Sequence, residues 1–449
     1  MNREREVKAA LPAAEVDPAI PRRRKLGLFD VLCIGVNAIV GSGVFALPDD
    51  MQRSMGGFSP LAYALCAVLL LPIALCFAEL SSRTDETGAA YVYARRAFGA
   101  KAGFFVGWYC WATTFVSWAA NTTLFIEILG FTSYPLNKIL GVGTVVALGV
   151  VNYVGIKPGA WLVNTVTIGK LAAIFCFLAV AVFAMDPSRL GGTLPLGMAG
   201  VGQGIYLALF PLQGFEVAPV AAGETDNPRR NVPLGTIGSV LFSALLFIVV
   251  QAVLVGAYPA LGAESEQPLV DAARSLGPRL GLIVLVGSLI SIGGFNAGCA
   301  LGAPRYAQAI AAHDFLPAPL ARTHARWGTP HVAIVVTTAL TAGLAFFFDY
   351  RKLVGMTNTA VLVQYLFSCL AVPVLRRKDK PAVKGWMIPG GPVVPAIGAL
   401  GSLALFKLAV FTEENKTELY FAGATLVIGI AVAFISSRSA RPGAPDAST

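Results

Sequence analysis

Charged residues and histidines are scarce in this sequence. Only 13% of its 449 residues are charged, 56% are hydrophobic, and the mean hydropathy is +0.68. So few charges could not cover the surface of a soluble domain of this length, which excludes a soluble protein. The three histidines, His313, His324 and His331, lie in or beside one loop, without the short spacing or cysteine company of a zinc site. We therefore expect neither a bound metal nor a cofactor.

Signals for secretion, disulfide formation and covalent catalysis are also missing. All seven cysteines fall inside apolar runs, where cysteine acts as a small hydrophobic residue, so we predict no disulfide. Residues 1–25 lack an apolar core followed by a small-residue cleavage site, and we expect a disordered cytoplasmic leader. We find no nucleophile, metal cluster or carboxylate pair placed at a membrane face, which argues against a membrane-embedded enzyme.

Long apolar runs dominate the rest of the chain. A helix of about 20 apolar residues crosses the ~30 Å hydrocarbon core of a bilayer, and about twelve runs approach or exceed that length. They cover residues 27–48, 57–80, 103–129, 139–156, 161–184, 200–222, 232–258, 279–302, 332–349, 353–374, 393–411 and 418–436. We predict an all-α polytopic membrane protein in the lipid bilayer, with a transmembrane domain at 26–437 and a cytoplasmic tail at 438–449.

The basic residues indicate how the chain is oriented. Most of the 34 lysines and arginines lie in the leader, in residues 81–102, 303–330 and 376–384, and elsewhere on the N-terminal side of this topology. Lysine and arginine in short loops resist translocation, so both termini are expected on the cytoplasmic side of the cell membrane. This topology accounts for the net charge of +9, and no nucleic-acid partner is required.

Two glycines interrupt the first apolar run at about its middle. Gly41 and Gly43 tolerate dihedrals that an α-helix does not use. Unwinding there frees backbone groups that cannot stay unpaired in hydrocarbon, so the segment must face protein, water or a ligand. The alternative is that the glycines only let another helix pack closely. We predict a broken helix and a binding site at Val40, Gly41, Ser42 and Gly43.

The sixth run is interrupted in the same way. A proline, a glycine and a carboxylate lie inside it, in the stretch Phe210-Pro211-Leu212-Gln213-Gly214-Phe215-Glu216. Interrupted segments at corresponding places in two halves of a transporter mark its binding site. Free N–H groups favour a carboxylate and free carbonyl groups favour a cation, and an α-amino acid offers both charges. The predicted substrate-binding residues here are Phe210, Gly214, Phe215 and Glu216.

Lys170 lies deep inside the fifth run. It is about 13 Å along that helix, which places it close to the bilayer midplane. An ammonium group there costs about 2.5 to 3.5 kcal/mol to insert, so it must face the bundle interior and find a partner, or lose its proton. The alternative, a lysine that snorkels to the membrane surface, needs more reach than its four carbons provide. We therefore predict that Lys170 couples transport to protons.

Two further runs mix polar, small and aromatic residues. The third contains Trp108, Trp111, Thr113, Thr114, Ser117, Trp118 and Asn121. The eighth contains Ser288, Ser291, Gly293, Gly294, Phe295 and Asn296. We expect both runs to border the cavity, with Trp118 and Phe295 at the substrate and Ser291 involved in coupling. Interfacial anchoring of tryptophan and close helix packing are the alternatives.

These motifs resemble the amino acid/polyamine/organocation (APC) transporter superfamily. The residues that carry the resemblance are Gly41–Phe45, Gly214–Glu216, Ala222–Pro233, Tyr91–Gly99 and Pro304–Ala307, and the similarity covers nearly all of residues 27–430. It implies a LeuT-like core that works by alternating access. That core would consist of two inverted five-helix repeats, at about 27–184 and 200–374, followed by two extra helices at about 393–436.

The resemblance also implies roles for individual residues. Gly41, Ser42 and Gly43 would bind the substrate carboxylate, carbonyl groups around Phe210 and Gly214 its ammonium, and Lys170 would replace a sodium ion. Phe210 falls where relatives have an occluding aromatic residue. The sequence departs from the arginine/agmatine antiporters, which lack this lysine and have an asparagine where Trp118 stands, and this argues against a long cationic substrate. The outer loop at 130–137 lacks a cysteine for a disulfide-linked light chain.

The sequence thus predicts a permease, a secondary transporter that moves a neutral α-amino acid with a proton as the coupling ion. A sodium-independent exchanger of amino acids or amines is the alternative mechanism. A sensor that binds the same substrate without moving it would carry the same motifs.

Overall fold

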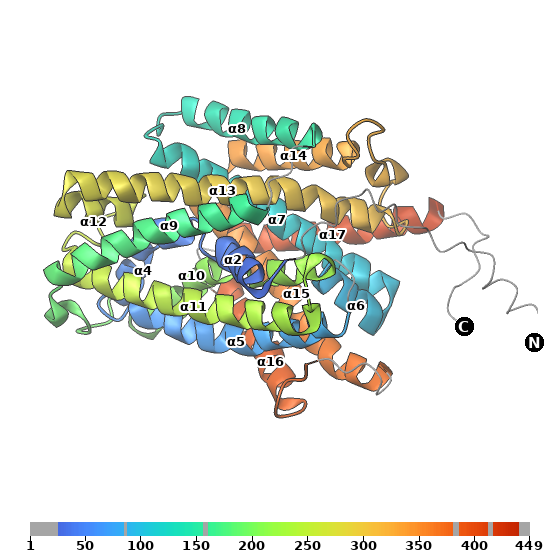
Figure 1. Ribbon diagram of the computed structural model, residues 1–449, viewed down its shortest axis with the longest axis horizontal. Coiled ribbons are helices and arrows are strands. Elements are labelled where there is room, and N and C mark those ends of the chain that lie inside the picture. Colours follow the sequence, from blue (N-terminus) through green and yellow to red (C-terminus); the bar gives the residue numbers. More distant parts are fainter. Residues whose placement is uncertain (1–25, 85–87, 156–159, 380–385, 412–415, 440–449) are drawn as a thin grey trace, which may run out of the picture.

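The computed structural model describes residues 26–84, 88–155, 160–379, 386–411 and 416–439 (Figure 1). The predicted leader and nearly all of the predicted tail lie outside these ranges. Within them, every regular element is a helix. The only extended pairings in the described residues are two isolated bridges, Leu26 with Thr225 and Gly57 with Gly191.

Ten long helices form the bulk of the described bundle. They are α5 (Pro60–Ser82), α7 (Ala100–Ile128), α8 (Leu136–Tyr153), α9 (Ala160–Ala181), α11 (Pro228–Ala257), α13 (Pro278–Ala311), α14 (His331–Phe347), α15 (Tyr350–Lys378), α16 (Val393–Phe411) and α17 (Lys416–Ser439). Six of these, α5, α8, α9, α11, α13 and α15, are long and apolar enough to cross a membrane. The predicted all-α polytopic class is confirmed to that extent, while the count of twelve spans stays a prediction.

Three of the remaining predicted spans differ from a simple apolar helix for identifiable reasons. Helix α7 has 29 residues but carries many polar side chains. The first run is divided into α2 (Leu28–Ile39) and α3 (Gly43–Ala46) and is followed by α4 (Pro48–Met55), and the sixth is divided into α10 (Gly197–Leu212) and the 3-10 helix η3 (Phe215–Glu224). At 1.5 Å per residue, α2 alone reaches only about 18 Å. Two short helices, α6 (Ala90–Phe98) and α12 (Pro268–Leu276), connect the longer ones.

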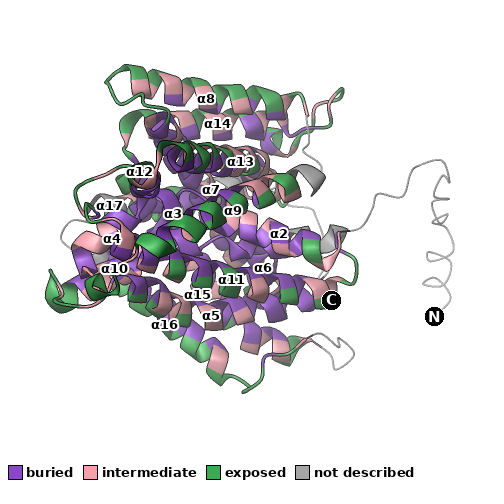
Figure 2. Cartoon of the chain, turned by 60° about the vertical axis from the view of Figure 1, so that its left-hand side comes forward, coloured by how far each residue is buried: buried purple, intermediate pink, exposed green. Residues whose placement is uncertain are grey.

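The helices form layers around the broken segments. In Figure 1, α8 and α14 lie side by side as an outer layer, and α13 separates them from α2, α10 and α11. Figure 2 shows buried residues concentrated in the centre of the bundle and exposed ones along the outer faces of α8 and α14. The exposed face of α8 is apolar: Ile139, Val146 and Val150 are 57%, 45% and 57% exposed. A face of this kind suits contact with lipid chains.

The two ends of the bundle carry different clusters of ion pairs. We call the end with α6 and the last turns of α5 and α15 the α6 end. Here the carboxylate of Glu79, which is fully buried, accepts hydrogen bonds from Arg83 at 2.7 Å, from Arg376 at 2.5 Å and from the N–H of Ile388 at 2.9 Å. This buried cluster ties α5 to α15.

We call the opposite end, which contains α4, α12 and the first turn of α15, the α4 end. Arg351 pairs there with Asp50 at 3.1 Å and with Glu266 at 2.9 Å, and Arg53 pairs with Glu264 at 2.9 Å. The side chains of Arg351 and Glu266 are 41% and 46% exposed, and that of Glu264 is 80% exposed. This second cluster is therefore in contact with solvent.

Candidate functional site

The first break lies where the two glycines predict it. Helix α2 ends at Ile39, and the N–H of Gly41 turns back to the carbonyl of Ile39 at 2.9 Å before α3 begins at Gly43. A Cβ atom on Gly43 would lie 2.7 Å from Cγ and 3.0 Å from Cα of Pro211. Because real Cβ atoms do not approach other atoms so closely, glycine at this position lets the first break touch the second.

The second break depends on glycine for two reasons. Gly214 has a φ of 116°, in the region that favours glycine, and a Cβ there would lie 2.5 Å from the carbonyl oxygen of Ala38 in α2. Its N–H donates to Oε2 of Glu216 at 2.9 Å. The same oxygen accepts a hydrogen bond from the hydroxyl of Tyr365 at 3.0 Å. The start of η3 is thus closed by a carboxylate from its own first turn.

Lys170 caps the carbonyl end of the first break. Its side chain is completely buried, and Nζ donates to the carbonyl oxygens of Asn37 at 2.9 Å and Val40 at 2.5 Å. The hydroxyl of Ser291 donates to the carbonyls of Val40 at 3.0 Å and Gly41 at 3.3 Å. The last carbonyl groups of a helix have no partner within it and carry partial negative charge, so a cation is favoured there. The prediction that this lysine faces the bundle interior is confirmed.

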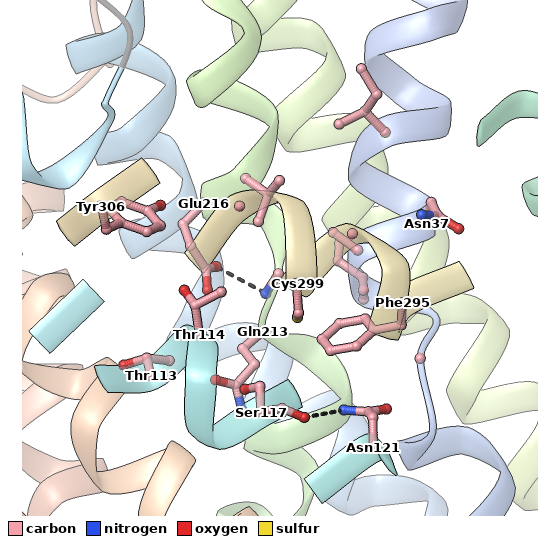
Figure 3. Close-up of a pocket in the computed structure, with 18 of the residues that line it drawn as sticks. Asn37, Thr113, Thr114, Ser117, Asn121, Gln213, Glu216, Phe295, Cys299 and Tyr306 are labelled. Carbon is pink, nitrogen blue, oxygen red and sulfur yellow. Dashed lines mark hydrogen bonds between the residues drawn. The ribbon is translucent and has the colours of Figure 1, made fainter. Parts of the chain in front are cut away.

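The two breaks border one cavity of about 380 Å³ (Figure 3). Seven of the residues predicted at the substrate site line it: Gly41, Ser42, Gly43, Phe210, Gly214, Glu216 and Phe295. Helix α7 contributes Thr113, Thr114, Ser117 and Asn121, and α13 contributes Phe295 and Cys299 among others. From the breaks, the lining continues toward the α6 end as far as Arg305 and Ala309.

The side of the breaks nearer the α4 end is closed by Tyr350. Its hydroxyl lies 3.1 Å from Oγ of Ser42 in a hydrogen bond, and its ring contacts the ring of Phe210 edge-on at 6.1 Å between centroids. Tyr350 is 3% exposed and is not among the described residues that line the cavity. The cavity is therefore separated from the α4 end by contacts between α3, α10 and α15.

A model of the amino acid permease family matches residues 26–433 of this chain. The chain belongs to the amino acid permease family. The predicted membership of the APC superfamily is thereby confirmed, and membership implies an amino acid substrate and a membrane environment.

Individual relatives resemble the permease along most of its length. The branched-chain amino acid permease BcaP of Bacillus subtilis (strain 168) is 26% identical over 439 residues, which cover 93% of each chain. BcaP of Lactococcus lactis subsp. cremoris (strain MG1363) is 27% identical and covers 90% of this chain and 92% of its own. A methylthioribose transporter of B. subtilis is 25% identical and covers 84% of this chain and 86% of its own.

Three residues predicted at the substrate do not line the permease cavity. Trp118 is completely buried and packs against Val145 and Ala300. On α7 it lies one turn after Thr114, and its side chain packs in a buried cluster with Cys299 and Phe295 without lining the cavity. Phe215 is stacked on Tyr365 at 5.2 Å between ring centroids. Val40 takes part only through its backbone, as the acceptor for Lys170 and Ser291.

Three residues that the structure brings to the site were not among the predicted substrate-binding residues. Asn121 and Gln213 both line the cavity, and Tyr350 closes it on one side. Asn121 lies on the same face of α7 as Thr113, Thr114 and Ser117, at a spacing that follows helical periodicity. That spacing was available in the sequence, but it does not select Asn121 over Trp118, which follows Thr114 at the same spacing. No sequence motif marks Tyr350, and only its contacts with Ser42 and Phe210 show that it belongs to the site.

Proposed function

We propose that this permease is a secondary active transporter that moves a neutral α-amino acid across the cytoplasmic membrane by alternating access, driven by a proton gradient. One observation carries the proposal: two broken helices meet at a single cavity, and a buried lysine caps the carbonyl end of one of them. The names of the branched-chain permeases support an amino acid substrate. Another relative is named as a methylthioribose transporter, so overall sequence similarity alone does not determine the substrate.

The proposed pose follows from which backbone groups are already bonded. The carbonyl of Val40 accepts hydrogen bonds from both Lys170 and Ser291, which uses both of its lone pairs, so it is not an acceptor for the substrate ammonium. That group would bind carbonyls around Phe210 and Gly214 at the second break. The N–H groups that begin α3 have no acceptor within their own helix, and they would receive the substrate carboxylate at Ser42 and Gly43.

Proton coupling rests on where the Lys170 ammonium lies. It bridges α9 to the last carbonyls of α2, beside Ser291 of α13, in a position where a sodium ion would otherwise be held by oxygen atoms. Loss of its proton would remove the charge that holds α2, and regaining the proton would reset the carrier. A permanently protonated lysine that only tethers α2 corresponds to the alternative, an exchanger.

The positive-inside rule assigns the α6 end to the cytoplasm in this proposal. The cavity lining extends toward that end, while the contact between Tyr350 and Ser42 closes the other side. The structure would therefore represent the state that faces the cytoplasm. In the opposite state, α3 and α4 would separate from Tyr350 and the α6 end would close.

Uptake into proteoliposomes tests the proposal. Purified permease would be given a panel of labelled amino acids in sodium-free buffer, in empty and in substrate-loaded vesicles, with and without an inward proton gradient. We expect accumulation in empty vesicles only when the gradient is present. Uptake that ignores the gradient and requires internal substrate would establish exchange instead. A strict sodium requirement would contradict both mechanisms, and binding without any flux would indicate a sensor.

A further inference from the structure

Two polar atoms on one face of α7 point to a ligand that the proposed function does not yet account for. Oδ1 of Asn121 and Oγ1 of Thr113 are buried and accept or donate no hydrogen bond within the described part of the chain. Asn121 is 1% exposed and Thr113 is 6% exposed, and both line the cavity. Leaving a buried polar group unpaired costs about 1 to 3 kcal/mol, so such atoms are expected to find a partner when the cavity is filled.

The orientation of the Asn121 amide is fixed by its neighbour. Nδ2 donates to the carbonyl oxygen of Ser117 at 2.8 Å, one turn back along α7 (Figure 3). The oxygen and nitrogen of an amide are usually distinguished only by such hydrogen bonds, and a carbonyl can accept only from the NH₂ end. The free end of Asn121 is therefore an acceptor, and its partner must bring an N–H or O–H group.

The backbone of an amino acid substrate does not supply this donor. Oδ1 of Asn121 lies beside Gly41, 3.8 Å from the position of a Cβ on that glycine, at the break that would hold the substrate carboxylate. A carboxylate has no proton to donate, and the ammonium would be held at the second break. Thr113 is eight residues from Asn121, or about 12 Å along the helix, so a single ammonium could not reach both.

We propose that Asn121, on the polar face of α7 that also carries Thr113 and Ser117, accepts a hydrogen bond from a donor on the substrate's side chain. The substrate class is then an amino acid with an uncharged hydroxyl or amide side chain, in preference to one with a pure hydrocarbon side chain. This inference rests on the proposed function.

The charge of the lining favours an uncharged donor over a cationic one. Glu216 is the only carboxylate among the described residues that line the cavity. Its Oε2 already accepts hydrogen bonds from the Gly214 N–H and the Tyr365 hydroxyl. A cationic side chain at Asn121 would meet an amide oxygen without a compensating negative charge. Across the cavity, Phe295 and Cys299 of α13 offer an apolar surface for the hydrocarbon part of the side chain.

Matched pairs of amino acids test the selectivity. Threonine and valine have nearly the same shape and differ by a hydroxyl in place of a methyl group, and asparagine and leucine form a second pair. A site that hydrogen-bonds its substrate rejects an analogue that lacks the group. We expect threonine and asparagine to compete for uptake at concentrations at least about tenfold lower than valine and leucine. Stronger competition by the hydrocarbon member of each pair, or by lysine or arginine, would overturn the inference.

Two variants connect the selectivity to α7. Asn121→Leu and Thr113→Val keep similar side-chain sizes and remove one polar group each. We expect the preference for the donor-bearing member to fall to about twofold or less in Asn121→Leu and to stay nearly unchanged in Thr113→Val, because the Thr113 hydroxyl lies about 12 Å along the helix from Asn121. Thr122→Val is the matched control, because its buried hydroxyl bonds to the Trp118 carbonyl and does not line the cavity. An unchanged preference in Asn121→Leu would contradict the inference.

Thermal stabilisation of the purified permease separates this inference from the proposed function. A ligand at 100 times its Kd stabilises the folded state by about 2.7 kcal/mol, whether or not it is transported. If threonine and asparagine raise the melting temperature more than valine and leucine but no amino acid accumulates in vesicles, the subsite stands and the transport proposal fails. If valine and leucine stabilise equally well while uptake is normal, the transport proposal stands and the subsite fails.

Discussion

The two broken helices are held open by different partners. The carbonyl end of the first break is capped by Lys170 and Ser291, which come from α9 and α13 and are distant in sequence. The N–H of Gly214 at the second break is capped by Glu216, two residues further along the same segment. The second break is therefore capped mainly from its own segment, with one further hydrogen bond from Tyr365 of α15, whereas the first takes its partners from other helices. We expect the first break to move during transport and the second to keep its shape.

The largest effect should come from Gly214→Ala. A side chain there must adopt a φ of 116° and would contact the Ala38 carbonyl oxygen at 2.5 Å, and together these cost at least about 3 kcal/mol. We expect a marked loss of folded protein, measured as yield and melting temperature in detergent. Gly302→Ala is the control, because it lines the same cavity and a Cβ there would meet no atom within 4 Å. Equal stability of the two variants would show that the second break is not locally fixed.

The next largest effect should be on binding, in Gly41→Leu and Gly43→Leu. The added side chain would fill the space for the substrate carboxylate and favour a continuous helix, so we expect binding to be abolished in both. Alanine variants distinguish the two glycines. The added Cβ would lie 2.7 Å from Pro211 in Gly43→Ala but 3.4 Å from Phe295 in Gly41→Ala. Gly43→Ala should therefore weaken binding more than Gly41→Ala. Thermal-shift titration measures both, and unchanged affinity in the leucine variants would contradict the site assignment.

Lys170→Ala should separate binding from coupling. Without the ammonium, the Asn37 and Val40 carbonyls lose their hydrogen bonds to it, while Ser291 still reaches Val40. We expect accumulation driven by a proton gradient to be lost, with substrate affinity reduced by less than about tenfold. Uptake and thermal shift are measured on the same preparation. Gradient-driven accumulation that persists in this variant would remove Lys170 from the coupling mechanism.

The smallest effect should come from Ser291→Ala. The hydroxyl shares the Val40 carbonyl with Lys170, so its removal costs one hydrogen bond, or about 1 kcal/mol. We expect about a fivefold change in transport affinity with coupling retained. A loss as large as that of Lys170→Ala would show that the two partners of the first break act as one unit.

The breaks could be predicted from the sequence because glycine and proline inside an apolar run leave few alternatives. Lys170 was also identifiable, since its depth alone required an interior partner. Its actual partners, the carbonyls of Asn37 and Val40, were not, because backbone acceptors leave no trace in composition. Trp118 was misplaced because the third run is polar and aromatic on several faces, and composition does not say which face turns inward. Helices α4 and α12 were not predicted because neither forms an apolar run.

The ion pairs at the two ends of the bundle imply that salt acts more strongly on one end than on the other. Mobile ions screen charges in contact with water over about 8 Å at physiological ionic strength, but act much less on buried pairs. The pairs of Arg351 and Arg53 at the α4 end are exposed to this screening, whereas the Glu79 cluster at the α6 end is not. Raising the ionic strength on the α4 side alone should speed the opening of that end. The transport rate should then depend on which side of the vesicle receives the salt.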